Sequence, residues 1–223
     1  MLALAASSLN AASVGNSVTE FSGVQGQDNW YYGYWAGAGS GYLPADFIQM
    51  DISDWTGTIW DYGPGSNFLT ITSTSWHPNG GSGTGAIQTP FRRWLAEGTG
   101  DLTISGQWRN NDTLRATNAT TRNGTTARIY VEGSVVYTQK IAWTAYPAYT
   151  AYTLTIPVTL GDSVDFSVHY DGDVNDDMTY FTAELDLVLA PEPVTTPEPA
   201  TWTILALGLS ALVWRGTNRS TRP

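Results

Sequence analysis

The sequence predicts an all-β protein, an antiparallel β-sandwich of the jelly-roll-like kind, with a single hydrophobic helix at the C-terminal end. Within residues 18–189 apolar side chains recur with a period of two, and no long window has helical spacing. Gly-, Asn- and Asp-containing turns separate these short segments, which is typical of sandwiches with one buried and one solvated face per sheet. An apolar run at residues 200–214 predicts the helix.

Strands are expected wherever alternating segments are bounded by turns. Two hairpins are predicted in the second half: one turns at Glu132-Gly133 and the other at Gly161-Asp162. A final strand has Phe181, Leu185 and Leu187 on its apolar face. The earlier strands are expected at residues 18–21, 30–35, 47–50, 55–60, 68–75, 86–94 and 101–108.

Length and composition indicate one domain, residues 14–190, which is large enough for a sizeable core. The chain has no cysteine, so neither a disulfide framework nor a thiolate site is available. The formal charge of −10, with Lys140 as the only lysine, argues against nucleic acid as a partner. Cations or neutral polymers fit this balance better.

The N-terminal residues 1–13 are Ala- and Ser-rich and look like the remnant of a signal peptide, with cleavage expected before Val14. No Lys or Arg precedes the apolar residues, so a truncated or upstream start is expected; a disordered leader is the alternative. At the other end, residues 191–196 form a Pro-rich linker that is expected to be extended.

Residues 197–223 combine a Pro-Glu-Pro motif, an apolar segment and a basic tail. As a helix the apolar segment is shorter than the roughly 30 Å hydrocarbon core of a bilayer, so it spans marginally. Tryptophans near its ends suit the interface, and the arginines are expected to stay in the cytoplasm. The alternative is a buried helix of a soluble domain. The motif is Pro197, Glu198 and Pro199; the membrane segment includes Ala200, Trp202, Leu205, Leu207, Leu209, Leu212 and Trp214; the tail carries Arg215, Arg219 and Arg222.

This order of motif, apolar segment and arginines resembles the PEP-CTERM sorting signal of bacteria that make exopolysaccharide. The resemblance implies export, transient anchoring in the inner membrane, and recognition by the membrane enzyme exosortase, which delivers such proteins to the cell surface or extracellular matrix. The tail here is longer than usual and its arginines are more dispersed. This resemblance covers about the last tenth of the chain and leaves the partner of the body open.

Ten tryptophans and twelve tyrosines make aromatic residues the main functional clue in the body. Flat rings with polar neighbours suit stacking on sugars, and Trp30, Trp55 and Trp76 are the candidate ligand-binding residues. Packing in the core is the alternative for each of them. Residues 21–34, Trp76-His77-Pro78, Arg92-Arg93-Trp94, and residues 103–106 and 161–166 resemble a secreted carbohydrate-binding-like β-sandwich module.

The acidic loop at residues 171–177 offers oxygen ligands at alternating positions, a pattern that suits Ca²⁺. Its candidate ligands are Asp171, Asp173, Asn175 and Asp177. It lacks the glycine and the distant glutamate of an EF-hand, and an ordinary hairpin turn is the alternative.

We do not expect an enzyme. The two histidines, His77 and His169, are far apart in sequence, and His77 is interpreted as a structural loop residue. No pair of carboxylates stands out for glycoside hydrolysis, and Asp162 and Asp165 are expected at a turn and a rim. The sequence therefore predicts a sorted matrix protein that associates with extracellular polysaccharide. A calcium-stabilised matrix protein without glycan affinity and a polysaccharide-active enzyme are the alternatives.

Overall fold

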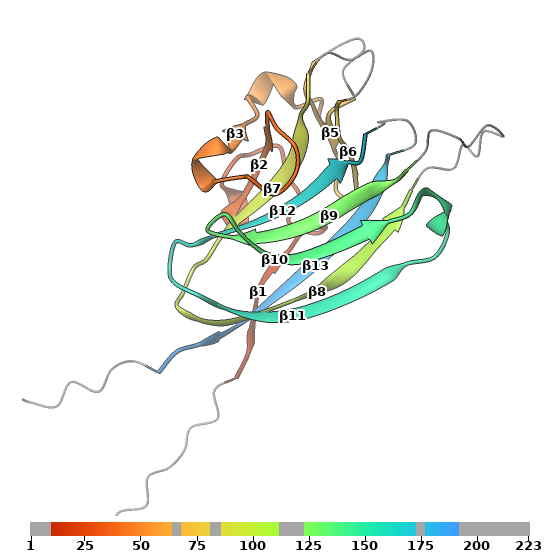
Figure 1. Cartoon of the computed structure of the whole chain (residues 1–223). Coiled ribbons are helices and arrows are strands. Elements are labelled where there is room, and N and C mark those ends of the chain that lie inside the picture. The colour runs from red at the N-terminus through yellow and green to blue at the C-terminus, as the bar shows by residue number, and fades with distance from the viewer. Residues whose placement is uncertain (1–9, 64–67, 81–85, 112–122, 173–176, 192–223) are drawn as a thin grey trace, which may run out of the picture. The chain divides into compact units, whose positions relative to one another are not determined.

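The computed structural model describes residues 10–63, 68–80, 86–111, 123–172 and 177–191. The chain divides after Ala190 into two units, and the second, residues 191–223, is almost entirely outside these ranges. Two antiparallel sheets make up the first unit, together with four short 3-10 turns (Figure 1). The prediction of an all-β antiparallel sandwich is confirmed. The predicted C-terminal helix lies outside the described residues.

The first sheet, here called sheet A, has seven strands in the order β11-β8-β13-β6-β5-β4, with β1 paired to β13. Its long strands pair over their full length, from Gly100 with Leu189 to Asn110 with Thr179. Its strands are β1 (Ala12–Asn16), β4 (Trp60–Asp61), β5 (Thr70–Ile71), β6 (Ser75–His77), β8 (Gly100–Asn110), β11 (Thr150–Val158) and β13 (Thr179–Leu189).

The second sheet, sheet B, has six strands in the order β10-β9-β12-β7-β2-β3. β12 lies at its centre and pairs antiparallel with both β7 and β9. Its strands are β2 (Trp30–Trp35), β3 (Ile48–Gln49), β7 (Thr89–Leu95), β9 (Thr125–Val131), β10 (Ser134–Ile141) and β12 (Ser163–Tyr170).

From β7 onward the chain crosses between the sheets at every connection except the β9–β10 hairpin. The strand order is that of a jelly roll, with β7-β12-β9-β10 in sheet B and β13-β8-β11 in sheet A. The predicted hairpin at Glu132-Gly133 is confirmed: both residues have positive φ, 47° and 77°, as a two-residue turn of the favoured hand requires. The second predicted hairpin is wrong, because Gly161-Asp162 carries the chain from sheet A to sheet B, and β11 and β12 do not pair.

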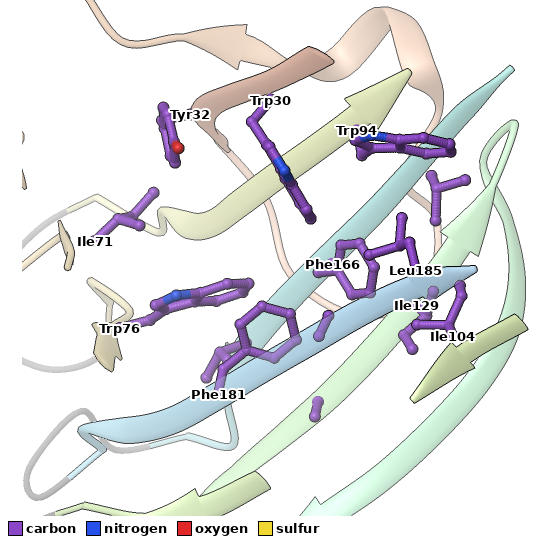
Figure 2. Close-up of a cluster of buried hydrophobic side chains, with 14 of the residues drawn as sticks. Trp30, Tyr32, Ile71, Trp76, Trp94, Ile104, Ile129, Phe166, Phe181 and Leu185 are labelled. Carbon is purple, nitrogen blue, oxygen red and sulfur yellow. The ribbon is translucent and has the colours of Figure 1, made fainter. Parts of the chain in front are cut away.

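Alternating side chains from the two sheets fill the space between them (Figure 2). Phe166 of β12 contacts Phe181 of β13 with ring centroids 5.2 Å apart, and Trp30 of β2 contacts Phe166 at 5.9 Å. These contacts join the sheets through one aromatic core. Such aromatic pairs stabilise the fold beyond the contribution of simple burial.

Residues 17–29 and 36–62 are less regular than the sequence predicts. The predicted strand at 18–21 is a turn, since the Asn16 side chain accepts hydrogen bonds from the backbone amides of Val18 and Thr19. The segment at 55–60 is also not one strand, because it folds back and pairs Trp55 with Trp60. Short 3-10 turns occur here at Gln27–Asn29 (η1), Pro44–Asp46 (η2) and Ile52–Asp54 (η3), and later at Trp143–Ala145 (η4).

At the N-terminal end β1 begins at Ala12, which pairs with Leu187 of β13. Two residues assigned from the sequence to the signal-peptide remnant, Ala12 and Ser13, therefore take part in this strand.

Candidate functional site

The three tryptophans expected to bind ligand lie in or against the core. Trp30 and Trp76 are 1% and 0% exposed, so for these two the alternative of packing in the core holds and they are not available to a ligand. The rings of Phe166 and Phe181 cover them, at 5.9 Å and 4.5 Å. Trp55 is partly buried against Phe21 and Trp60. Side-chain alternation in β2 and β6 turns the indoles of Trp30 and Trp76 inward. The three tryptophans therefore do not form one surface.

A buried arginine, Arg92, contacts this aromatic core. Its guanidinium lies within 6 Å of the rings of Phe21, Tyr32, Trp76 and Phe181 and donates to the backbone oxygens of Ser17 and Thr72. Burial lowers the pKa of Arg92 to about 9, a shift that the negative charge of an ionised Tyr32 would oppose. Ring faces and carbonyls together stabilise a buried cation, so this arginine holds the N-terminal turn in place.

On the outer face of sheet B, residues 37–47 form a segment that covers the strands; we call it the covering segment. Tyr42 is 1% exposed and packs on Phe91 and Tyr130, with ring centroids 4.3 Å and 5.1 Å away. Arg128 donates to the backbone oxygen of Gly39 (2.8 Å), and Thr89 donates to that of Gly37 (2.7 Å). Aromatic packing and these hydrogen bonds hold the covering segment against the sheet.

A buried ion pair lies beneath the covering segment. Arg93 donates to both carboxylate oxygens of Asp165 (2.8 and 3.0 Å), and Tyr42 donates to the same carboxylate (2.9 Å). Burial raises the pKa of Asp165, and the bonds from Arg93 oppose that shift. Burial would lower the pKa of Arg93, but the hydrogen bond and charge of Asp165 raise it overall.

Asp165 is 0% exposed, so its prediction as a rim residue is wrong; β12 runs under the covering segment at that point. Asp162, by contrast, lies in the turn, where its carboxylate accepts from the backbone amide of Thr159 (2.7 Å). With its oxygens engaged by Arg93 and Tyr42 and covered from solvent, the Asp165 carboxylate cannot reach a substrate.

His169 is buried further along β12 on the same outer face, against Tyr130 and Ser167. Its Nε2 lies 3.1 Å from the Tyr130 hydroxyl and 2.9 Å from that of Ser167. Burial, with a smaller contribution from the charge of Arg128, lowers the pKa of His169 to about 3, so the imidazole is neutral at ordinary pH. The other histidine, His77, lies in β6, where its Nδ1 is 2.7 Å from the Pro78 carbonyl oxygen.

Beside the covering segment there is a hollow of about 230 Å³, lined by Tyr31, Phe47, Gln49, Arg93 and Leu95. The Phe47 ring lies 4.3 Å from the guanidinium carbon of Arg93. Because this guanidinium already donates to Asp165, Tyr42 and Pro44, the hollow presents few unused donors.

The outer face of sheet A is open. Here residues of the strands β11, β8 and β13, which are adjacent in Figure 1, line a hollow of about 240 Å³. The backbone approaches closely at Gly106, where an added Cβ would collide with the Thr182 carbonyl oxygen. Gln107, Thr153 and Glu184 are exposed, and they supply amide, hydroxyl and carboxylate groups. The hollow is lined by Ser105, Gly106, Gln107, Ala151, Tyr152, Thr153, Thr182 and Glu184.

Aromatic side chains flank one end of this hollow. Tyr149 is 49% exposed, and its ring lies 5.3 Å from that of Tyr180. The guanidinium of Arg109 lies 4.4 Å from the Tyr149 ring centroid and 5.1 Å from that of Tyr180. The strand register places Arg109 opposite Tyr180, one row from Gln107 and Thr182. A ring face and several hydrogen-bonding groups are therefore adjacent on an exposed sheet.

The acidic loop is described only at its ends. Asp171 accepts hydrogen bonds from Thr126 (3.0 and 2.8 Å) and forms an ion pair with Lys140, while Asp177 is buried. Asp173 and Asn175 lie outside the described residues. Within the part of the chain that the structure describes, no three acidic or histidine side chains cluster as a metal site. Calcium binding by the loop as a whole stays a prediction.

The sorting motif, membrane segment and basic tail also lie outside the described residues. Within the described residues, none of the helices has the length and hydropathy needed to cross a bilayer.

The sequence contained a partial signal for the open face. Thr182, Glu184 and Asp186 alternate with the apolar residues of the last strand, and they lie on its face away from the core. Strand pairing, which joins them to Gln107 and Thr153, could not be predicted from alternation alone.

The fold and this face define an antiparallel β-sandwich with one covered and one open sheet. No protein-family model matches the sequence, and no curated protein is significantly similar to it. Solved structures that resemble it include a family 35 carbohydrate-binding module from Clostridium thermocellum, with 15% identity over 50% of this chain and 86% of that chain and a TM-score of 0.30.

A second is rabbit GITRL, with 12% identity over 53% of this chain and 95% of that chain and a TM-score of 0.31. A third is a β-glucosidase from Kluyveromyces marxianus in complex with glucose, with 10% identity over 72% of this chain and 16% of that chain and a TM-score of 0.32. At these identities and TM-scores the likeness assigns neither ligand nor partner to this chain.

Proposed function

We propose that this chain is an exported bacterial surface or matrix protein whose β-sandwich binds extracellular polysaccharide across the outer face of β11, β8 and β13. The observation that carries the proposal is the hollow on that face, where exposed amide, hydroxyl and carboxylate groups adjoin the half-exposed ring of Tyr149. Sugars present apolar ring faces and hydroxyl edges, so a site for them needs an aromatic surface next to hydrogen-bonding groups.

The outer face of sheet B is less suited to binding a sugar than the outer face of sheet A. There the aromatic rings of Tyr42 and Phe91 are buried against each other, and the carboxylate of Asp165 is engaged by Arg93. Groups already paired within the protein contribute little to ligand binding.

Affinity electrophoresis of the full-length protein in gels containing β-glucan, xylan, galactomannan or alginate tests the proposal. We expect at least one polysaccharide to retard the protein and Tyr149→Ala to abolish that retardation. Tyr31→Ala, at the hollow on the opposite face, is the matched control and should migrate like the wild type. Unretarded wild-type protein in every gel, or loss only in Tyr31→Ala, would contradict the proposal.

Export and sorting form the other half of the proposal, and they rest on the order of motif, apolar segment and arginines in residues 197–223. Exosortase is the proposed processing partner, and the membrane anchor is transient. Replacement of Pro197, Glu198 and Pro199 by alanine should leave an unprocessed product in the membrane fraction of the producing bacterium. Full-length, unprocessed wild-type protein in the cytoplasmic fraction would refute sorting.

A further inference from the structure

The open face extends beyond the hollow as an ordered series of rows across three strands. The register pairs outward-facing residues of β11, β8 and β13 at two-residue intervals. Successive rows on one face are about 6.8 Å apart along a strand, so four rows span about 20 Å. The rows are Tyr149, Arg109 and Tyr180; Ala151, Gln107 and Thr182; Thr153, Ser105 and Glu184; and Thr155, Thr103 and Asp186.

The chemistry of this face changes along the strands. Its first row offers the exposed ring of Tyr149, with Arg109 held by stacking and by a hydrogen bond to Asn111 (2.6 Å). Small side chains follow in the hollow, where Ala151 leaves room beside Gln107. The far rows carry the carboxylates of Glu184 and Asp186. A ligand that crosses the face thus meets an aromatic surface first and hydrogen-bond acceptors last.

The acidic end determines which polymers fit. An exposed carboxylate accepts hydrogen bonds from sugar hydroxyls, and it repels a carboxylate of a uronic acid. Among the described residues, those that line the hollow include no basic side chain. The cation of the first row, Arg109, lies two rows, or about 14 Å, from Glu184 and is engaged by the rings of Tyr149 and Tyr180 and by Asn111, so it offsets this repulsion little. The net charge of −10 acts in the same direction.

We propose that this face selects a linear, uncharged polysaccharide that lies along the strands, with one sugar ring against Tyr149 and sugar hydroxyls donating to Glu184. This selectivity rests on the proposed function, since it concerns the same face. A length of about 20 Å along the strands suits several consecutive sugar units rather than a single terminal one. Glu184 is the specificity-determining residue, and Tyr149 positions the chain.

The test uses the full-length protein, a neutral polysaccharide that retards it, and the same polymer after oxidation of its primary hydroxyls to carboxylates. We expect the charged form to bind roughly five- to tenfold more weakly, a difference that Glu184→Gln reduces. Glu97→Gln removes the same charge at an exposed position outside the face and should leave the difference unchanged. A charged form that binds as well as the neutral one, or equal effects of both variants, overturns the selectivity.

Chain length provides a second measurement. Titration calorimetry with oligosaccharides of the neutral polymer should show affinity that rises from the disaccharide upward, and a monosaccharide that binds as tightly as the polymer overturns the linear arrangement. Retention by carboxylated polysaccharides alone would refute this selectivity but leave glycan binding in place. Absence of retention by any polysaccharide would refute the proposed function itself.

Discussion

The two outer faces of the sandwich are built from the same kind of alternating strands, yet they differ in what covers them. On sheet B the covering segment packs against the strands, which leaves its own Tyr42 only 1% exposed and Asp165 of β12 0% exposed. On sheet A the corresponding face leaves Gln107, Thr153 and Glu184 exposed around a hollow. A polar outward-facing residue can therefore be a structural group on one sheet and a ligand-binding candidate on the other.

This difference separates stability from recognition. Paired groups under the covering segment are fixed by their partners within the protein, so their loss should affect folding. Groups on the open face have solvent as their main partner, so their loss should affect binding and leave stability nearly unchanged. Variants on the two faces test this separation.

The largest effect is expected for Asp165→Ala. It leaves the guanidinium of Arg93, which is 15% exposed, without its carboxylate, and loss of one partner of such a pair should lower the free energy of unfolding by about 3 kcal/mol. Urea denaturation measures the change. Asp101→Ala, an exposed position on sheet A, is the control and should stay within about 0.5 kcal/mol. Similar losses in the two variants would contradict the separation.

Acidification should weaken the covered face through His169. Its folded pKa of about 3 lies below the unfolded value of 6.5, so between these values the unfolded chain binds a proton that the folded chain does not. The free energy of unfolding is therefore fully retained above pH 6.5 and falls by about 1.4 kcal/mol per pH unit as the pH drops toward 3.

The raised pKa of Asp165 acts in the opposite direction, because the folded protein keeps that proton to higher pH. Comparison of wild type with His169→Gln isolates the histidine, and denaturation curves between about pH 7 and pH 5 should show a smaller pH slope in the variant. Parallel slopes would show that His169 takes up its proton in the folded state.

A smaller effect is expected for Tyr42→Phe. The ring stays packed on Phe91, but the hydroxyl that donates to Asp165 (2.9 Å) and accepts from Arg93 (2.6 Å) is lost. Stability should fall by about 1 kcal/mol in thermal or urea denaturation. Tyr149→Phe removes a hydroxyl from a half-exposed ring and should cost less; the reverse order would be inconsistent with a covered network on sheet B.

The smallest change in stability is expected on the open face. Gln107→Ala should alter the free energy of unfolding by no more than about 0.5 kcal/mol, because its side chain is exposed. The same variant should weaken retention by the polysaccharide that retards the wild type. A loss of stability comparable to that of Asp165→Ala would show that the hollow is a structural feature.

Alternation predicted much of the fold because it depends on local geometry. β2 was expected at residues 30–35 and occurs at Trp30–Trp35, and the Glu132-Gly133 hairpin followed from its turn residues. The error at Gly161-Asp162 has the same origin: a tight turn between two strands looks alike in sequence whether the strands pair or cross to the other sheet.

The candidate site was less predictable. Aromatic residues are the clearest functional signal in the sequence, but two of the candidates, Trp30 and Trp76, are core residues. The exposed ring of Tyr149 was not singled out, since its exposure depends on the pairing of β11 with β8. Asp165 was expected at a rim because nothing local indicates that the covering segment, more than a hundred residues earlier, folds over it.

Local alternation is enough to establish the all-β class, most strand positions and the inward direction of the apolar side chains, because it is a property of neighbouring residues. Which strands are adjacent, which outer face is covered, and which polar groups stay open to solvent are settled by the packing of the whole domain. Those features arise from contacts between residues far apart in the chain, and such contacts leave no local pattern in the sequence.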